Sequence, residues 1–233
     1  MTMISTNLQT VRNRIDAACL AAGRASGSVQ LLAVSKTLGP ETVAQAFAAG
    51  QTAFGENYIA EAVHKIQALA ALPIEWHCIG PIQSNKTRLV AEHFAWAQSV
   101  DRFKIAQRLS EQRLTHLPPL NVCLQVNVDA GANKSGVTPD ELQTLAHAVA
   151  ALPNLKLRGL MCIPEPAPDF AAACAVFAKA QALLVALNRS GLSLDTLSMG
   201  MSADLEAAIH AGSTLVRVGT AIFGGRAPSP AGA

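Results

Sequence analysis

The sequence of 233 residues has little charge and few aromatic side chains. Charged residues make up 15% and aromatic residues 4%, with one tyrosine, whereas 50% of the residues are hydrophobic. Disordered chains combine low hydrophobicity with high charge, so this composition excludes extended disorder. The net charge is only +2, and no cluster of lysine and arginine stands out. The sequence therefore gives no electrostatic reason to expect a nucleic-acid partner.

Paired cysteines are also lacking, and we expect neither a secretory leader nor a membrane span. The five cysteines are scattered and none is spaced as C-x-x-C, which argues against a disulfide framework or a zinc site. The first residues lack the basic-then-apolar order of a secretory signal. Residues 170–187 are rich in alanine and contain Lys179 and Gln181, so we interpret them as a soluble helix. We expect a cytoplasmic chain without a membrane partner.

Short apolar runs alternate with longer helical stretches along the chain. The runs lie at residues 31–34, 52–54, 76–79, 94–100, 121–128, 157–162, 196–198 and 215–218. This alternation predicts βαβ units and a parallel sheet. Eight units fit a closed barrel better than an open doubly wound sheet, and no G-x-G-x-x-G follows the first run. The prediction is an α/β fold: a single (β/α)8 TIM barrel over residues 1–233, with an extra helix near residues 6–22.

Lys36 stands just after the first apolar run. Chemistry in a parallel barrel is expected at the carboxyl ends of the strands, which places Lys36 at the mouth of the barrel. Partial desolvation there favours the uncharged amine, which can attack a carbonyl carbon. Two interpretations stay open at this point. Lys36 either forms a Schiff base with a ligand or extends its head group into water.

The last run contains a charged residue, Arg217. Strands of a barrel are buried on both sides, so its guanidinium should meet either a protein carboxylate or an acceptor on a ligand. Gly219 and Thr220 follow it and predict a turn whose amides face an anion. Ser202, after the seventh run, is a candidate N-cap of the next helix. Each feature alone is explained by a cap or a turn, but together they predict a phosphate site at a customary place in barrels.

A lysine amine across the barrel mouth from a phosphate site predicts a phosphorylated carbonyl ligand. Pyridoxal 5'-phosphate (PLP) fits, because its aldehyde can bond the lysine while its phosphate occupies the second site. Arg217 would then meet the pyridine nitrogen. A guanidinium only donates hydrogen bonds, so the ring nitrogen would stay unprotonated and the cofactor would be a weak electron sink.

Four further polar residues are less decisive. Asn57 follows the second run and is either a turn residue or a hydrogen-bond partner of a ring substituent. His77 is best interpreted as a satisfied core histidine. Lys86 and Lys134 stand in polar loops, where they either touch an anion or are simply solvated.

Several segments together resemble one family, the pyridoxal phosphate homeostasis proteins, which are related to the amino-terminal barrel of alanine racemase. The segments are LLAVSKT, FGENY, EWHCIGPIQSNK, VNVDAGANKSG, GLMCIP and LSMGMSADLEAAIHAGSTLVRVGTAIFG. The resemblance is specific in order and spacing and extends from about residue 8 to Arg226. One departure is the loop at residues 129–133, which lacks a glutamate that relatives often have.

This resemblance implies a role for each candidate residue. Lys36 corresponds to the lysine that holds PLP, Asn57 to a residue beside the ring and Arg217 to the partner of the pyridine nitrogen. The implied phosphate ligands are Ser202, Gly219 and Thr220. The family is understood as a carrier or regulator of PLP in vitamin B6 and amino-acid balance. PLP-dependent apo-enzymes are the candidate recipients.

The main alternative is a PLP-dependent amino-acid racemase with weak activity. Racemisation needs a second acid/base on the other face of the cofactor, which in alanine racemase is a tyrosine from a separate β-domain of the partner subunit. Here nine residues follow Gly224, and the sole tyrosine, Tyr58, is on the second loop. We therefore expect binding without turnover, and a monomer. A third interpretation uses Lys36 as an aldolase-type Schiff base on a phosphorylated sugar, which would leave the protein colourless.

Overall fold

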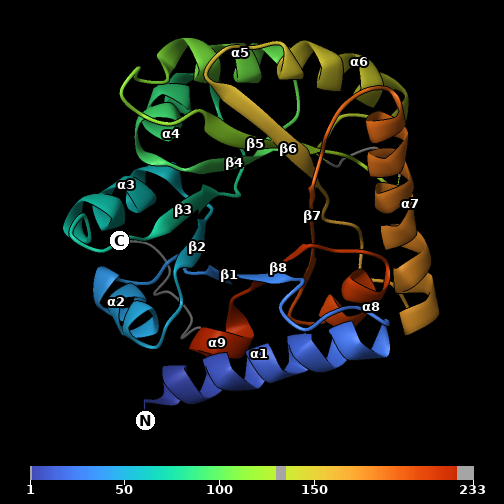
Figure 1. The fold of residues 1–233 in the computed structure, drawn as a ribbon. Helices are drawn as coiled ribbons and strands as arrows, with labels where there is room; N and C mark the ends of the chain where they lie inside the picture. Colours follow the sequence, from blue (N-terminus) through green and yellow to red (C-terminus); the bar gives the residue numbers. More distant parts are fainter. Residues whose placement is uncertain (1, 130–134, 225–233) are drawn as a thin grey trace, which may run out of the picture.

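Eight parallel strands close into a barrel in this protein (Figure 1). The structure is a computed structural model that describes residues 2–129 and 135–224. The strands are β1 Gln30–Val34, β2 Ala53–Glu56, β3 Glu75–Cys78, β4 Trp96–Val100, β5 Leu120–Gln125, β6 Leu155–Met161, β7 Thr196–Met201 and β8 Leu215–Val218. Each strand pairs with its sequence neighbours, and β8 pairs with β1. The predicted (β/α)8 barrel is confirmed.

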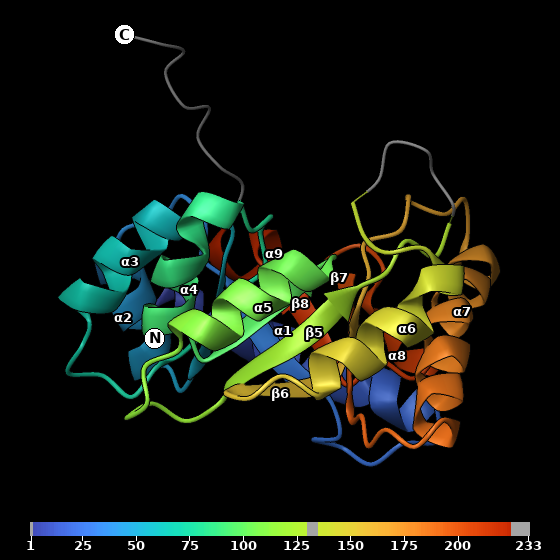
Figure 2. The same cartoon turned by 90° about the horizontal axis from the view of Figure 1, so that it is seen from above.

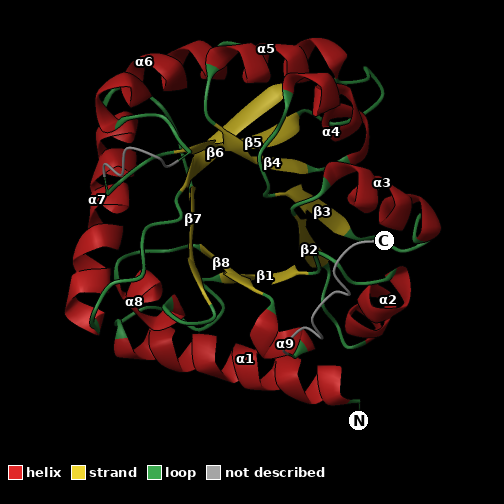
Figure 3. Ribbon diagram, turned by 180° about the vertical axis from the view of Figure 1, so that it is seen from behind, coloured by secondary structure: helices red, strands yellow, loops and turns green. Residues whose placement is uncertain are grey.

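Helices form an outer layer around the strands (Figure 3). They are α1 Met3–Ala21, α2 Pro40–Ala48, α3 Ile59–Ala68, α4 Thr87–His93, α5 Phe103–Gln112, α6 Pro139–Ala150, α7 Phe170–Arg189, α8 Leu205–His210 and α9 Thr220–Phe223, with a 3-10 turn, η1, at Ser84–Lys86. Seen from above, α5 and α6 lie next to each other outside β5 and β6 (Figure 2). The helix that opens the chain, α1, is the predicted extra one and packs against α8 and α9.

The position of α1 follows from its apolar spacing. Leu8, Val11, Ile15 and Ala18 recur every three or four residues, so they share one face, and all four are buried. Burying each of the larger side chains contributes about 1.5–3 kcal/mol. The hydroxyl of Thr2 begins the helix by accepting a hydrogen bond from the Ser5 amide at 3.2 Å. This helix therefore turns its apolar face toward α8 and α9, against which it packs.

Among the described residues, α7 is the one helix with the length and hydropathy of a membrane span. Composition alone is weak evidence, because core helices of barrels can pass the same test. The carboxylate of Asp169 caps α7 by accepting a hydrogen bond from the Ala172 amide at 2.8 Å. Phe177, Ala180 and Leu187 are buried on its inner side, against the barrel. These contacts favour a helix of the barrel's outer layer.

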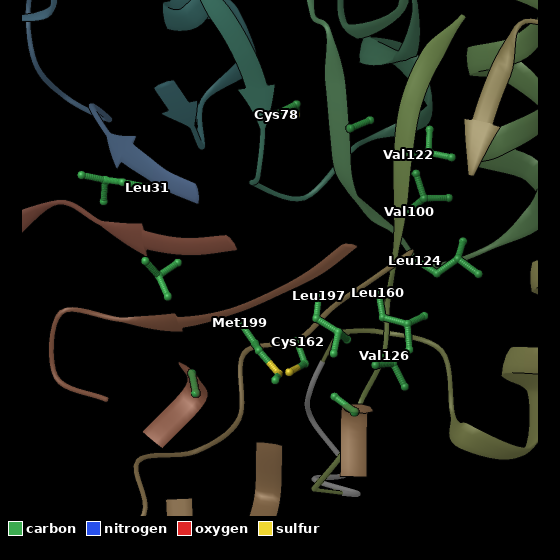
Figure 4. Packing of buried hydrophobic residues seen from close by; sticks show 14 of the residues in the cluster. Leu31, Cys78, Val100, Val122, Leu124, Val126, Leu160, Cys162, Leu197 and Met199 are labelled. Carbon is green, nitrogen blue, oxygen red and sulfur yellow. The ribbon is translucent and has the colours of Figure 1, made fainter. Parts of the chain in front are cut away.

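The period of two along each strand divides the side chains between an outer and an inner core. On β1, Leu31 and Ala33 face the helices, whereas Leu32 and Val34 pack inside the barrel. Figure 4 shows part of the outer core, in which Leu160 and other apolar residues of β4 to β7 meet. Inside the barrel, apolar residues form two smaller clusters, and buried polar side chains are also present. The same alternation continues past the strand ends and determines which way the site residues point.

Candidate functional site

A cavity of about 320 Å³ lies at the carboxyl ends of the strands. Its wall contains all six predicted site residues, namely Lys36, Asn57, Ser202, Arg217, Gly219 and Thr220. Apolar side chains supply most of the remaining wall, among them Val34, Ile79 and Phe223. The volume is in the range of small-molecule sites. Residues spread over most of the chain therefore meet at one place, although what each does toward a ligand stays a prediction.

Lys36 reaches the cavity because it continues the inner series of β1. Leu32 and Val34 pack inside the barrel, and Lys36 is the next residue in the same alternation. The following residue, Thr37, has a φ of 66°, so the chain leaves β1 through a left-handed turn before α2. The half-buried lysine thus stands at the end of a rigid strand, as the sequence predicted.

Arg217 lies on the inner face of β8 and is 4% exposed. Its Nη1 donates to the backbone oxygen of Ser198 at 2.6 Å and to the Ser198 Oγ at 2.8 Å. Its Nη2 donates to the backbone oxygen of Cys162 at 2.9 Å. The expectation that the guanidinium must meet a carboxylate or a ligand is wrong in this respect, because neutral oxygens of Ser198, within β7, and of Cys162, just after β6, hold it. Burial lowers the pKa of Arg217 from its ordinary value.

A chain of hydrogen bonds crosses the barrel interior from Arg217. The Ser198 hydroxyl donates to Gln98 Oε1 at 2.6 Å, and Gln98 Nε2 lies 2.8 Å from His77 Nδ1. An amide nitrogen only donates, so Nδ1 of His77 accepts and the proton is on Nε2, which lies 2.9 Å from Glu75 Oε1. Burial lowers the pKa of His77 and keeps it neutral. His77 is therefore a satisfied core histidine, as predicted. In every hydrogen bond of this chain, the donor is on the Arg217 side and the acceptor is on the Glu75 side.

The predicted phosphate site differs in detail from the expectation. The chain does not make a simple turn after β8, because Thr220 begins the short helix α9 and Gly219 is its N-cap. The amides of Thr220 and Ala221 precede the first helical hydrogen bonds and are therefore donors for an anion. A Cβ on Gly219 would lie 3.1 Å from the Val34 backbone oxygen, so the close approach of β8 and β1 favours glycine there.

Ser202 is not the cap of the following helix. The helix α8 begins at Leu205, its N-cap is Asp204, and the Asp204 carboxylate accepts a hydrogen bond from the Met201 amide at 2.6 Å. The predicted capping role of Ser202 is therefore wrong. Ser202 instead lies in the preceding turn and lines the cavity, so its hydroxyl is available to a ligand without a capping role.

Asn57 supplies an unmatched acceptor in the cavity wall. Its Oδ1 is buried and has no hydrogen-bond partner among the described residues. A buried acceptor without a donor is costly, so this atom favours a ligand or water that donates to it. The backbone of Asn57 packs so closely on Gly80 that a Cβ there would lie 2.1 Å from the Asn57 backbone oxygen. This contact holds Asn57 in place at the cavity.

The residues fit a phosphorylated aldehyde such as PLP. The amine of Lys36, the guanidinium of Arg217, the backbone amide of Thr220, the hydroxyl of Ser202 and the orphaned amide oxygen of Asn57 belong to residues of one wall. A neighbouring cavity of about 610 Å³ shares Ile163, Met201 and Ala203 with the first. Its wall contains four carboxylate residues, namely Glu165, Asp169, Asp204 and Glu206, which suit a phosphate ester poorly. The first cavity is therefore the better anion site.

The remaining predicted residues lie elsewhere. Lys86 ends the 3-10 turn η1 and is not in the cavity wall. Lys134 and residues 130–133 of the loop that departs from relatives are outside the described residues. Two residues that were not predicted, Ser198 and Gln98, support Arg217: Ser198 contacts it directly, and Gln98 contacts Ser198. The buried Lys65 was not predicted either, although the Glu61–Lys65 spacing of four residues on a helix was a usable signal.

Comparison with known families agrees with the barrel fold and shows to which class of barrel proteins the chain belongs. A model of the family described as "Alanine racemase, N-terminal domain" matches residues 6–227. Fold and match together define a barrel of the alanine racemase N-terminal class. Proteins named pyridoxal phosphate homeostasis protein are 61% identical over 226 residues in Pseudomonas aeruginosa and 51% identical over 229 residues in Escherichia coli K12. These matches cover 97% of this chain and 97% and 98% of those proteins, so the chain belongs to the pyridoxal phosphate homeostasis protein family.

Solved structures of other proteins have the same barrel fold. PipY of Synechococcus elongatus PCC7942 is 37% identical in a structure without PLP, with a TM-score of 0.85, and 36% identical in one with PLP bound, with a TM-score of 0.83. Both comparisons cover 95% of this chain and 100% of PipY. Alanine racemase of Corynebacterium glutamicum, at 19% identity and a TM-score of 0.69, shows the shared fold alone, over 63% of that protein. The resemblance read from the sequence is thereby confirmed.

Proposed function

We propose that this protein binds PLP as a Schiff base on Lys36 and acts as a carrier or regulator of PLP in vitamin B6 and amino-acid balance. The observation that carries the proposal is the meeting of Lys36, Arg217 and Thr220, the first residue of α9, at one cavity. The PLP-bound structure of PipY, a relative of nearly the same extent, supports it. The proposal treats residues 1–233 as one PLP-binding barrel.

Each cavity residue has a distinct part in this proposal. Lys36 supplies the amine for the aldehyde of PLP. Ser202, Gly219 and Thr220 hold the phosphate by a hydroxyl and by helix amides. Asn57 lies beside the ring, where its orphaned oxygen gains a partner. When bound, PLP supplies an electrophilic aldehyde and an electron-accepting ring.

Arg217 keeps that ring a weak electron acceptor. The guanidinium is held by the Ser198 and Cys162 oxygens and cannot accept a hydrogen bond, so it can only donate to the ring nitrogen. The pyridine nitrogen then stays unprotonated. The inner chain through Gln98 and His77 orients the Ser198 hydroxyl, whose lone pairs face Arg217. The arrangement binds PLP while disfavouring carbanion chemistry on it.

The cavity wall also favours binding over racemisation. Among the described residues that line it, only Lys36 and Arg217 are ionisable. Tyr58, the sole tyrosine of the sequence, is 56% exposed and is not in this wall. Two-sided proton transfer needs a second group near the ligand, so weak racemase activity remains the less favoured function. We place the protein in the cytoplasm as a monomer that passes PLP to apo-enzymes.

The test begins with the purified protein in the presence of PLP. A yellow colour, followed by borohydride reduction and peptide mass mapping of the adduct to Lys36, is the expected result. Lys36→Ala is the control and should lose the adduct entirely. A colourless protein would favour the phosphorylated-sugar alternative, and an adduct on another lysine would refute the site.

Two further measurements examine turnover and the ring contact. Incubation with L- and D-alanine in deuterium oxide should give no sustained washout of the α-hydrogen, whereas continued exchange would establish the racemase. Arg217→Glu should retain PLP but shift its absorbance, because a carboxylate stabilises a protonated ring nitrogen. An unchanged spectrum in the folded variant would refute the contact.

A further inference from the structure

A buried ammonium lies just outside the barrel, behind Lys36. Lys65 of α3 is 3% exposed, and its Nζ lies 2.8 Å from the Ser35 backbone oxygen, 2.8 Å from Glu56 Oε1 and 2.6 Å from Glu61 Oε1. An ammonium has three N–H groups, so these three acceptors satisfy it completely. None of the four residues lines the cavity.

The same group of side chains holds the backbone on both sides of Lys36. On one side, Lys65 contacts the Ser35 backbone oxygen, and the Ser35 hydroxyl donates to Glu56 Oε1 at 2.6 Å. On the other side, the Thr37 amide donates to Glu61 Oε1 at 2.8 Å. Glu61 thus joins the buried ammonium to the residue that follows Lys36. We call Glu56, Glu61 and Lys65 the outer clamp.

The backbone that the clamp holds is strained. Thr37 has a φ of 66°, and only one other non-glycine residue of the described ranges, Asn154, has a positive φ. A β-branched residue disfavours this left-handed region. Such a conformation persists only where the surroundings impose it, and it occurs often at functional sites. The clamp supplies that constraint at the residue next to the proposed Schiff-base lysine.

Stability alone explains the outer clamp poorly. Taking an ammonium and a carboxylate out of water is costly, and well-packed apolar side chains often serve stability equally well. Glu56 is 1% exposed, and its second oxygen, Oε2, has no hydrogen-bond partner among the described residues, which adds to the cost. Burial also raises the pKa of Glu56 against the opposing effect of Lys65 and Ser35. Because this costly arrangement lies beside the loop after β1, we favour a role in positioning that loop.

We propose that Glu56, Glu61 and Lys65 are positioning residues that hold the left-handed turn after β1, so that the Lys36 amine faces the cavity. The inference deepens the proposed function and rests on it. PLP affinity is then determined partly by three charged residues that never touch the ligand. Period-two alternation explains the geometry, because Ser35 faces the clamp while Lys36 faces the cavity.

The experiment uses Glu61, whose side chain is 35% exposed and therefore tolerant of change. Glu61→Ala removes the acceptor of the Thr37 amide, whereas Glu61→Gln keeps an acceptor oxygen of the same reach. Glu92→Gln is the matched control, because Arg88–Glu92 is an i,i+4 ion pair on α4, like Glu61–Lys65 on α3. Three quantities are measured: hydrogen exchange of the Thr37 amide without PLP, the dissociation constant for PLP, and urea unfolding.

In Glu61→Ala we expect Thr37 exchange to be about tenfold faster and PLP binding about tenfold weaker, as for the loss of a charge-assisted hydrogen bond. Glu61→Gln should recover most of both effects, and Glu92→Gln should change neither. Unchanged Thr37 exchange in Glu61→Ala would overturn the clamp. Faster Thr37 exchange with unchanged PLP affinity would overturn the positioning role of the clamp. Weaker PLP binding that is fully explained by a loss of free energy of unfolding would overturn it too.

Failure of the proposed function gives a different result. If wild-type protein gives no PLP adduct on Lys36, the Schiff-base site is refuted, and positioning for that ligand is refuted with it. The exchange measurement needs no ligand and still decides whether the clamp holds the loop. Lys65→Met is a second variant with the same expected direction. Should it fail to fold, the Glu61 series stands by itself.

Discussion

The two faces of the barrel wall each bury one cation near the cavity, and they satisfy it in different ways. Outside, Lys65 meets the carboxylates of Glu56 and Glu61. Inside, Arg217 meets only backbone oxygens and the hydroxyl of Ser198. The outer site is thus neutralised within the protein, whereas the inner site keeps its positive charge beside a cavity. A cation left uncompensated at a cavity suits a ligand that brings an acceptor or an anion.

The difference also explains why the two cations are different residues. An ammonium is a compact, strongly hydrated charge, so its burial needs ionic partners. A guanidinium spreads its charge over a plane and is more weakly hydrated, so neutral oxygens can satisfy it. The inner chain extends this neutral support through Gln98 and His77 to Glu75, at the start of β3. We therefore expect the two faces to respond differently to substitution, to pH and to salt.

The largest expected effect is on the outer face. Lys65→Met leaves Glu56 buried beside no cation, which should lower the free energy of unfolding by about 3–5 kcal/mol. Arg217→Met leaves no carboxylate behind, only oxygens without donors, and should cost about 1–3 kcal/mol. Urea denaturation of both variants without PLP gives the comparison. Equal losses would show that the two buried cations are compensated in the same way.

An intermediate effect is expected in the middle of the inner chain. Gln98→Leu removes the donor to His77 and the acceptor of the Ser198 hydroxyl, both of which are buried. We expect a loss of about 1–3 kcal/mol in unfolding free energy. Because Ser198 then loses its fixed orientation, the absorbance of bound PLP should also shift. A stability loss without a spectral shift would show that the hydrogen-bond chain through Gln98 does not influence the contact between Arg217 and PLP.

The pH dependence should come from the inner face. Burial lowers the pKa of His77 below its usual 6.5, so the unfolded chain takes up a proton that native His77 resists. The contribution of neutral His77 to the free energy of unfolding is therefore fully present above pH 6.5 and is lost as the pH falls below that value. The slope is at most about 1.4 kcal/mol per pH unit. His77→Phe should flatten the unfolding free energy between pH 6.5 and 5. Identical slopes in variant and wild type would refute a neutral native His77.

The smallest expected effect is at a partly exposed ion pair between α1 and α8. Arg14 of α1 pairs with Glu206 of α8, and both side chains are about one-third exposed. Solvent screening limits such pairs, so Glu206→Gln should cost about 0–1 kcal/mol. Thermal melts at low and high salt test this, and the difference between variant and wild type should shrink in high salt. A loss of unfolding free energy as large as that of Lys65→Met would contradict the view that burial determines how much an ion pair contributes.

The eight strands and their helices could be predicted because each strand is a short apolar run before a helical stretch. The two shortest runs, at residues 52–54 and 196–198, correspond to β2 and β7. Placement at the carboxyl ends of strands also predicted Lys36, Asn57 and Arg217 as site residues; they line one cavity, and their roles toward a ligand stay predictions. The barrel prediction succeeded because it depends on periodicity and on general rules of barrel topology.

The errors arose where a choice depends on the path of the backbone. Ser202 and Asp204 are both good caps by residue type, and only the path of the loop makes Asp204 the cap of α8. The backbone oxygens of Ser198 and Cys162 that hold Arg217 have no sequence signature, because every residue has a carbonyl. Lys65 is an ordinary helix lysine in the sequence and becomes a buried clamp only beside Ser35.

By itself, the sequence determined the alternation of strand and helix, the closed barrel and the residues that stand at its mouth, because these follow from local periodicity. Only the tertiary structure decided which oxygens meet which cation. Side chains on adjacent positions of one strand diverge to opposite faces, and their partners here lie 21 to 100 residues away in the sequence. Such contacts depend on register and packing across the whole barrel rather than on neighbouring residues.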